Sequence, residues 1–316
     1  MLIFRGIPER AAQSTVLTIG NFDGVHLGHE ALLGRLVAHA RRVALPAAVM
    51  TFEPHPREFF APESAPARLT SLREKLRLLK AAGVDQTHIC RFDARFAALT
   101  AEDFVQRLLL RGLGVRHLII GDDFRFGSGR SGDFDMLRRA GAEHRFGLEA
   151  MQTISVAGER VSSSAVRDAL QESDLAHADR LLGRPYSIAG RVIHGQKLGR
   201  ELGFHTANIQ LKRNRLALTG VFAVTVEGVG PEPRSGVANL GMRPTVDSVA
   251  KPTLEVHLFD FDGDLYRAHL TVKFLARLRN QMKFDNLEAL ARQIERDVAQ
   301  ARAYFESPAA VAANRN

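Results

Sequence analysis

The chain is poor in cysteine and has no long apolar segment. Cys90 is the only cysteine among 316 residues, so no disulfide can form within the chain and secretion is not indicated. No apolar run approaches the roughly 18 residues that a membrane-spanning helix requires. Residues 1–10 also lack the apolar core of a signal peptide. We therefore expect a cytoplasmic protein that has no membrane partner.

The sequence also lacks a basic tract, although it is basic overall. Its formal net charge is +8, and its 43 lysine and arginine residues, most of them arginine, are scattered along the chain. No recognisable nucleic-acid-binding module accompanies them, whereas nucleic-acid binders usually gather such residues on one face. Polyanionic small substrates explain the charge at least as well. We expect small-molecule substrates, no nucleic acid, and a monomer or weak oligomer.

The length and composition are those of a globular protein with two domains. A domain averages about 150 residues, and the contents of 45% hydrophobic and 25% charged residues suit soluble domains with apolar cores. Residues 1–182 alternate strand-like and helix-like segments. From residue 183 the pattern changes to short strands and glycine turns up to 306. The Ala/Asn-rich segment 307–316 is predicted to be a disordered tail.

The first domain is predicted to be a doubly wound α/β domain. Expected strands are 15–19, 47–52, 87–92 and 115–120, and helices are expected from about His29, over 72–82 and over 101–111. Segment 115–120 is mainly apolar, as in a parallel sheet covered on both faces. Ligands of such sheets bind at the carboxyl ends of the strands.

The second domain is predicted to be a small antiparallel barrel closed by a helix. Expected strands are 186–193, 221–226, 236–240, 253–259 and 270–274, and the helix is expected over 287–305. Asp262-Gly263 predicts a hairpin turn between the last two strands. A calcium loop at 260–264 is rejected, because its twelfth position is Thr271 instead of glutamate and flanking helices are missing.

The most informative segment joins the first strand to the first helix. His26-Leu-Gly-His29 follows a glycine-punctuated turn, where backbone N–H groups and a helix dipole favour an anion. Gly28 lets a phosphate approach the backbone closely. Two histidines at this spacing can also ligate zinc, but the nearby sequence offers no usual third ligand. Ordinary surface histidines are the remaining alternative. The spacing resembles the His-x-Gly-His signature of nucleotidylyltransferases, which bind ATP.

Two other motifs follow strands of the first domain. Gly-Asp-Asp-Phe-Arg-Phe-Gly at 121–127 directly follows an apolar strand, and Ser-Ser-Ser-Ala-Val-Arg at 162–167 opens a helix. The serine hydroxyls can bind phosphate or simply cap the helix. With His-x-Gly-His and Phe-Glu-Pro-His-Pro at 52–56, these motifs closely resemble the FMN adenylyltransferase domain of bacterial bifunctional riboflavin kinase/FAD synthetases.

That resemblance implies ATP-binding and catalytic roles for residues of the first domain. His26 and His29 would bind ATP phosphates and stabilise the charge that develops at the α-phosphorus. The implied ATP site contains Gly20, Phe22, His26, Gly28, His29, Asp123, Ser163, Ser164 and Arg167. Phe124 and Phe126 would flank the flavin, although aromatic residues at such spacing are more often part of the core.

Residues 183–306 resemble the riboflavin kinase domain of the same family. The resemblance rests on Gly-Arg-Val-Ile-His-Gly at 190–195, Thr-Ala-Asn-Ile at 206–209, the glycine-rich segment 236–245 and Leu-Glu-Val-His-Leu at 254–258. It implies that Glu255 is the general base and that Thr206 and Asn208 hold Mg²⁺. The implied ATP-binding residues are Gly190, Gly195, Gly199, Thr206 and Asn208, and the implied flavin-binding residues include Arg279 and Phe284.

The second domain departs from the family pattern at two positions. His205 replaces the proline of the usual Pro-Thr-Ala-Asn loop, and Gln281 stands where the family usually has glutamate. The resemblance as a whole implies a bifunctional enzyme that phosphorylates riboflavin to FMN and then adenylylates FMN to FAD, using Mg-ATP in each step. The alternative is an FMN adenylyltransferase whose C-terminal barrel is a weakened kinase or a flavin sensor.

Overall fold

The chain forms two compact units. The computed structural model describes residues 1–194, 205–243 and 251–307. Unit 1 comprises Met1–Pro66 and Leu72–Ser163, and unit 2 comprises Ala67–Ser71 and Ser164–Asn316. The structural division therefore falls between Ser163 and Ser164, before the segment where the sequence pattern changes. The functional boundary near residue 183 stays a prediction.

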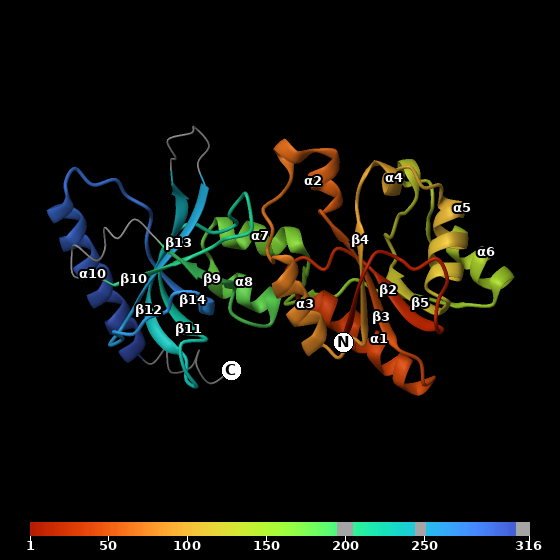
Figure 1. The fold of residues 1–316 in the computed structure, drawn as a ribbon, viewed down its shortest axis with the longest axis horizontal. Helices are drawn as coiled ribbons and strands as arrows, with labels where there is room; N and C mark the ends of the chain where they lie inside the picture. The colour runs from red at the N-terminus through yellow and green to blue at the C-terminus, as the bar shows by residue number, and fades with distance from the viewer. Residues whose placement is uncertain (195–204, 244–250, 308–316) are drawn as a thin grey trace. The chain divides into compact units, whose positions relative to one another are not determined.

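Unit 1 contains the expected parallel sheet of a doubly wound domain (Figure 1). All pairs between neighbouring strands in this sheet are parallel. Its strands, in spatial order, are β1 (Leu2–Arg5), β4 (Gln86–Arg91), β3 (Ala47–Glu53), β2 (Thr15–Ile19), β5 (Val115–Gly121) and β6 (Gly147–Met151). The central position of β2 and β5 brings their carboxyl ends together at one edge.

Helices pack apolar side chains against both faces of this sheet. On one face, Val16 and Ile119 pack against Leu33 of α1. On the other face, Leu17 and Leu118 belong to a second cluster. The principal helices of unit 1 are α1 (Leu27–Arg42), α3 (Leu72–Ala81), α5 (Ala101–Asp103), the π-helix η2 (Phe104–Gly112) and α6 (Phe134–His144). Because both faces are covered, the central strands are apolar at successive positions.

Short elements connect these helices and strands. They are α2 (Pro56–Phe60), η1 (Pro62–Ser64), α4 (Ala94–Ala97), η3 (Ser128–Arg130), and the two-stranded sheet of β7 (Ser155–Val156) and β8 (Glu159–Arg160). The helix expected over 101–111 is a short α-helical turn that continues as the π-helix η2.

Unit 2 contains a closed antiparallel barrel, as expected. Its strands, in spatial order, are β10 (Thr206–Ile209), β13 (Lys251–Leu258), β12 (Arg234–Arg243), β11 (Gly220–Glu227), β14 (His269–Arg279) and β9 (Ser187–Ile193). Pairing of β10 with β9 closes the barrel. The helices of unit 2 are α7 (Ser163–Gln171), which begins at the last residue of unit 1, α8 (Leu175–Leu182) and α10 (Leu287–Glu306).

The barrel core and the packing of α10 follow from the alternation of side chains along the strands. Phe222 and Phe274 are fully buried and contact each other edge to face, with ring centroids 5.3 Å apart. Val221 and Ala223, which alternate with Phe222 on β11, cluster with Ala301 of α10. The strand β11 is therefore buried on both faces, which explains its apolar run from Val221 to Val224.

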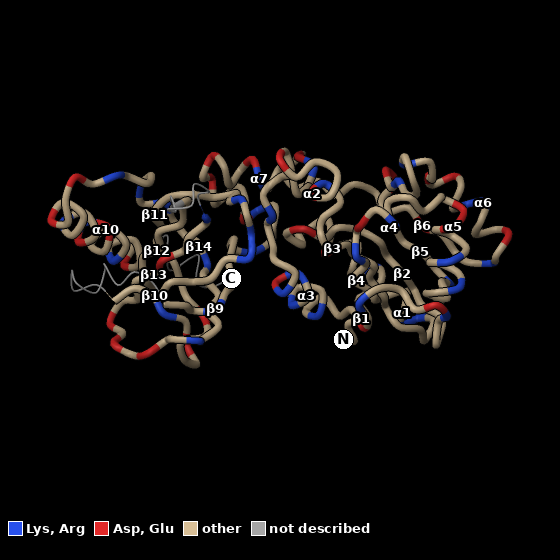
Figure 2. Tube along the Cα trace, turned by 45° about the horizontal axis from the view of Figure 1, so that its top comes forward, with Lys and Arg blue, Asp and Glu red and all other residues tan. Residues whose placement is uncertain are grey.

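Charged residues of both signs are distributed over each unit. In Figure 2, Lys and Arg positions are interspersed with Asp and Glu positions along the trace of each unit. Among the described residues, no helix combines the length and the apolar character needed to cross a bilayer.

Candidate active sites

The two histidines of the His-x-Gly-His motif lie where β2 leads into α1. His26 is the N-cap residue of α1, and its Nδ1 accepts a hydrogen bond from the backbone N–H of His29 at 3.3 Å. The two rings stack with their centroids 3.7 Å apart. Because His26 caps the helix, α1 begins at Leu27, earlier than expected. Two imidazoles and the amide groups of a helix N-terminus therefore meet at one place, which suits a phosphate.

Neighbouring residues fix the orientation of this histidine pair. Phe22 is fully buried, and its ring centroid lies 5.0 Å from that of His29. A Cβ at Gly28 would lie only 3.2 Å from the His26 ring, and one at Gly20 would lie 3.1 Å from the Phe22 ring. Larger residues at either position would push the aromatic rings aside. The two glycines and Phe22 thus support the arrangement of the histidines.

The zinc alternative for His26 and His29 lacks a third ligand in the structure. Among the residues that the structure describes, one group of three metal-ligand side chains is found, and it consists of His39, His117 and Glu149. Neither histidine of the motif belongs to it. The arrangement at the start of α1 therefore favours phosphate binding over a metal centre.

The serine motif forms the start of α7. The Ser163 hydroxyl donates a hydrogen bond of 2.9 Å to the backbone carbonyl of Asp23, in the turn between β2 and α1. Arg167 is largely buried, and its Nε donates to the carbonyl of Ala67 at 2.7 Å. Ser164 and Arg167 belong to unit 2. Their role beside the histidines of unit 1 stays a prediction.

The acidic motif begins at the carboxyl end of β5, beside the end of β2. Asp123 forms an exposed ion pair with Arg160 at 3.1 Å. Phe126 is buried in the core and stacks with Phe124, their centroids 5.8 Å apart. Phe124 is only partly buried. Of the two aromatic residues, Phe124 is thus the more accessible to a ligand, and a flavin contact stays a prediction for both.

Unit 2 contains a cavity of about 510 Å³, lined by residues of β9, β10 and β13 and of the connection that follows β13. Thr206 and Asn208 of β10 line it, so these two residues lie on a strand rather than on the expected loop. Residues 261–266, in the connection between β13 and β14, also line it. The cavity is lined by Val192, Ile193, His194, His205, Thr206, Ala207, Asn208, Val256, Leu258, Phe261, Asp262, Gly263, Asp264, Leu265 and Tyr266.

The hairpin predicted at Asp262-Gly263 is wrong. In the described part of the barrel, β13 pairs with β10 and β12, whereas β14 pairs with β11 and β9. The connecting segment 259–268 instead crosses the end of the barrel and is held to β9, where Arg267 N–H donates to the Val192 carbonyl at 3.2 Å. An Asp-Gly pair specifies a tight turn, but it does not specify that the flanking strands pair.

Glu255 lies in a row of polar side chains that includes Asn208, one of the residues lining this cavity. Its register partners are Asn208 on β10 and Asn239 on β12. Leu254 and Val256 are buried in the barrel, so Glu255 faces outward together with its two partners. The row continues with Gln281, whose Nε2 donates to Asn239 Oδ1 at 3.0 Å.

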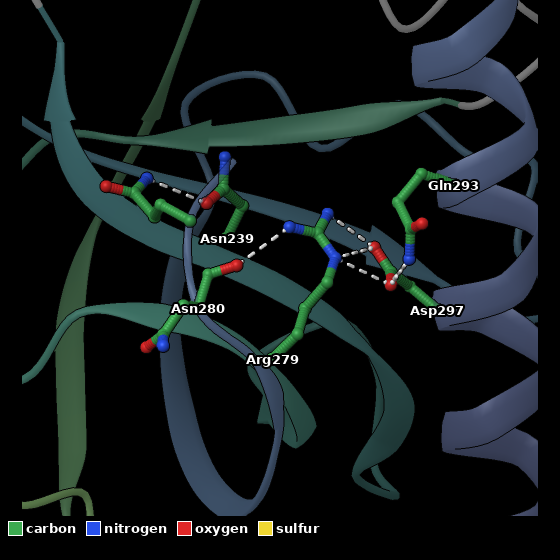
Figure 3. A network of polar contacts seen from close by, with 6 residues as sticks. Asn239, Arg279, Asn280, Gln293 and Asp297 are labelled. Carbon is green, nitrogen blue, oxygen red and sulfur yellow. Dashed lines mark hydrogen bonds and ion pairs between the residues drawn. The ribbon is translucent and has the colours of Figure 1, made fainter. Parts of the chain in front are cut away.

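A charged network anchors α10 next to this row (Figure 3). Arg279 binds the carboxylate of Asp297 through Nε and Nη2, at 2.8 and 2.7 Å, and Gln293 donates to the same carboxylate. The Arg279 guanidinium also lies 5.7 Å from the centre of the Phe284 ring. Arg279 is thus engaged in holding the helix, and its contact with flavin stays a prediction.

The predicted glycine loop is only partly described. Gly195 and Gly199 lie outside the described residues. A Cβ at Gly190 on β9 would lie 2.5 Å from the Gln210 carbonyl oxygen. The close approach of the neighbouring strand therefore requires this glycine, and an ATP-binding role for the three glycines stays a prediction.

Sequence reasoning missed several residues of the cavity wall. The rings of His194 and Tyr266 stack with centroids 3.8 Å apart, and the Arg267 guanidinium lies 5.6 Å from the Tyr266 ring. The carboxylate of Asp262 is 3.1 Å from Nδ1 of His205. These residues lie on connections that carry no periodic pattern, and only the Asp-Gly pair indicated a special turn there.

Comparisons with known proteins agree with two catalytic units. A family model described as FAD synthetase matches residues 9–165, and one described as riboflavin kinase matches residues 182–305. A protein of Escherichia coli K12 named bifunctional riboflavin kinase/FMN adenylyltransferase is 51% identical over 308 residues, covering 96% of this chain and 98% of that protein. A protein of the same name from Pseudomonas fluorescens is 52% identical over 307 residues, covering 96% and 97%.

A solved structure resembles the chain over nearly its whole length. It is described as a macrolide-efflux protein from Streptococcus pneumoniae, and it aligns with a TM-score of 0.80 and 28% identity. The alignment covers 96% of this chain and 99% of that one.

Proposed function

The chain belongs to the bifunctional riboflavin kinase/FMN adenylyltransferase family, and from this premise we propose how its residues share the two reactions. The enzyme transfers the γ-phosphoryl group of ATP to riboflavin, and then transfers the adenylyl group of a second ATP to the resulting FMN. The alternative of a weakened kinase or a flavin sensor is not supported, because the riboflavin kinase model matches residues 182–305 and the relatives are bifunctional.

In the kinase reaction, Glu255 is the general base. Its carboxylate would accept the proton of the riboflavin 5′-hydroxyl while that oxygen bonds to the γ-phosphorus and the bond to ADP breaks. The supporting observation is the row of Asn208, Glu255 and Asn239 at adjoining register positions, with Asn208 also lining the cavity. The cavity volume of about 510 Å³ is that of a small-molecule site.

Enzymes of these two families use ATP with a divalent metal ion. The proposed ion is Mg²⁺, held by the Thr206 hydroxyl and the Asn208 amide oxygen. Both are hard oxygen ligands, and Mg²⁺ binds few protein ligands while it keeps waters and phosphate oxygens. The carboxylates of Asp262 and Asp264 line the same cavity, so the lining suits a hard cation. The bound ion would neutralise charge on the transferred phosphoryl group.

In the adenylyltransferase reaction, His26 and His29 bind ATP phosphates. An FMN phosphate oxygen would bond to the α-phosphorus as the bond to pyrophosphate breaks, and the imidazoles would stabilise the negative charge that develops there. The stacked rings at the N-terminus of α1 support this assignment. Ser163, Ser164, Arg167 and Asp123 are proposed to complete the ATP site, and Phe124 to contact the flavin.

The two reactions are tested together by incubating the full-length protein with riboflavin and Mg-ATP and separating the flavins by chromatography. Successive appearance of FMN and FAD is expected. Omitting the divalent metal should stop both steps. Formation of FAD from added FMN without any FMN from riboflavin would overturn the kinase assignment.

A further inference from the structure

A group of metal-ligand side chains lies in unit 1 outside the adenylyltransferase residues. His39 comes from the last turn of α1, His117 from β5 and Glu149 from β6. One ligand atom of each lies within 4.8 Å of the other two. His117 Nε2 is 3.7 Å from Glu149 Oε2, and the rings of the two histidines are stacked with centroids 3.7 Å apart. Three separate elements thus bring two imidazoles and a carboxylate together.

The backbone around His117 leaves room for its ring. Gly147 on β6 is its register partner. A Cβ at this glycine would lie 2.2 Å from His117 Nδ1. Any other residue at this position would displace the imidazole from β6 and from Glu149. The sheet therefore fixes the position of the His117 ring, which would not be so for a histidine on an exposed loop.

This group lies toward the amino ends of the parallel strands, whereas His26 and His29 lie at their carboxyl ends. The strands are parallel, and α1 runs back against them from its N-terminal histidines. The last turn of α1 thus reaches the edge where β5 and β6 begin. None of these three residues is among those proposed above for the two reactions.

We propose that His39, His117 and Glu149 form a binding site for Zn²⁺. Two imidazole nitrogens and one carboxylate are ligands that Zn²⁺ favours, with water in a fourth position. Mg²⁺ would not compete effectively, because it prefers oxygen ligands. An ion here joins α1, β5 and β6, so its effect is expected on the stability of unit 1.

The site requires small side-chain rotations. Tetrahedral Zn²⁺ sets its ligand atoms roughly 3.3–3.6 Å apart, so the group must contract slightly and the two rings must tilt out of their stack. Arg42 Nη2 lies 3.0 Å from His39 Nδ1, and Arg35 forms an ion pair with Glu149. Both arginines are exposed and can turn toward water. They compete with the ion, and their removal should strengthen its binding.

The protonation state of the histidines suits a metal ligand. Burial lowers the pKa of His117, and the neighbouring His39 lowers it further. Glu149 raises this pKa, but by less than these two effects lower it. Burial and the Arg42 guanidinium likewise lower the pKa of His39 against the smaller effect of Glu149. Both shifts favour the neutral imidazole, which is the form that binds a metal ion.

The test uses the full-length protein after treatment with a chelator. Co²⁺ is titrated while the visible absorption of a low-symmetry site is followed, and Zn²⁺ affinity is measured by competition with a chromophoric chelator. One equivalent is expected to bind, with a rise in the melting temperature. His117→Ala and Glu149→Gln should each weaken binding at least about tenfold, and Arg42→Gln should strengthen it.

His144→Ala is the matched control, because His144 is another partly buried histidine of unit 1 outside the group. It should bind Zn²⁺ like the unaltered protein. Equal affinity of the unaltered protein, His117→Ala and Glu149→Gln would overturn the site. Binding that is lost in His29→Ala but kept in His117→Ala would place the ion at the other histidine pair and overturn it as well. If His117→Ala fails to fold, the Zn²⁺ affinity of Glu149→Gln decides, because Glu149 is partly exposed.

Discussion

Asn208 and Glu255 face each other across the antiparallel pair of β10 and β13. Directly opposite residues of such a pair have Cβ atoms about 4.5–5.5 Å apart on the same face of the sheet. The proposed metal ligand and the proposed general base are therefore neighbours because of strand register. Glu255 is only partly buried, so its replacement should impair the kinase reaction with little effect on folding.

Glu255→Gln is expected to abolish most FMN formation and to leave the conversion of FMN to FAD unchanged. An amide has nearly the same shape but cannot accept the proton of the 5′-hydroxyl. The measurement is initial rates of both steps, with the melting temperature as a check on folding. Glu232→Gln, on the exposed connection between β11 and β12, is the matched control. A Glu255→Gln variant that makes FMN at the normal rate would rule out the general-base role.

Most strands could be predicted from the sequence because they carry apolar runs between glycine or proline breaks. β2 and β5 have the expected starts. β10 was not predicted as a strand, because it has four residues and two of them are polar. The hairpin at Asp262-Gly263 was predicted wrongly, since a local turn signal does not determine which strands pair. The polar row around Glu255 depends on the pairing of β13 with β10 and β12, so no single segment of the sequence reveals it.

The histidine pair was easier to predict than its surroundings. His26 and His29 are close in sequence, and their position between a strand and a helix fixes their proximity. The contact of Ser163 with the Asp23 carbonyl joins segments far apart in the chain. The cavity residues His194 and Tyr266 are likewise distant in sequence. Such contacts depend on topology, and local patterns do not specify topology.

His29→Ala should reduce FAD synthesis about 10²–10³-fold, as expected when a donor to a developing oxyanion is removed. FMN formation should be unaffected. The rate of FMN formation is measured with riboflavin as substrate, and that of FAD synthesis with FMN. His144→Ala, which removes a histidine from α6 of the same unit, should leave both rates unchanged. Near-normal FAD synthesis by a folded His29→Ala protein would refute the assignment.

Asp179→Asn should stabilise unit 2 above pH 6. Burial raises the pKa of the Asp179 carboxyl to about 6. The hydrogen bond from the Tyr186 N–H and the charge of Arg184 lower this pKa, but by less than burial raises it. The folded state thus binds more protons than the unfolded state between about pH 4 and 6, and this contribution to stability is lost as pH rises through 6. The gain from the neutral amide should be about 1–2 kcal/mol at pH 7.5.

Denaturant unfolding between pH 5 and 8 measures this effect, and the gain should shrink toward the acidic end. Asparagine keeps an acceptor for the Tyr186 N–H, so packing changes little. Asp174→Asn is the control, because Asp174 is an exposed N-cap of α8 and asparagine caps equally well. An Asp179→Asn gain that does not vary with pH would show that the charge of the buried carboxylate is not its cause.

The two activities are expected to separate when the chain is cut near residue 183. A 1–182 fragment should make FAD from FMN, and a 183–316 fragment should make FMN from riboflavin. The cut removes α8 from unit 2, together with its buried Leu181 and Leu182 and the bond from Tyr186 N–H to Asp179. A 164–316 fragment should therefore melt at least about 5 °C higher than 183–316. If both fragments folded but neither was active, each active site would need residues from both fragments.

His205→Pro tests the first departure from the family pattern. His205 lines the cavity next to Thr206, and its Nδ1 lies 3.1 Å from Asp262, whereas its carbonyl oxygen lies 3.1 Å from Nδ1 of His257. The contact between the His205 ring and the Asp262 carboxylate is exposed, so its contribution to stability is small, within about 0–1 kcal/mol. Proline loses that pair but keeps the carbonyl, and its restricted φ lowers the entropy of the unfolded chain by about 0.4–1 kcal/mol.

These two effects oppose each other and are of similar size. We therefore expect His205→Pro to leave the kinase kcat nearly unchanged and to alter the KM for Mg-ATP only a few-fold. His205→Gln removes the imidazole contact with Asp262 without the backbone restraint, so the difference between the two variants isolates the effect of proline. Steady-state kinetics with riboflavin in excess measures both constants. A loss of more than about a hundredfold in both His205→Pro and His205→Gln would contradict this balance and assign the His205 side chain a direct role in binding ATP.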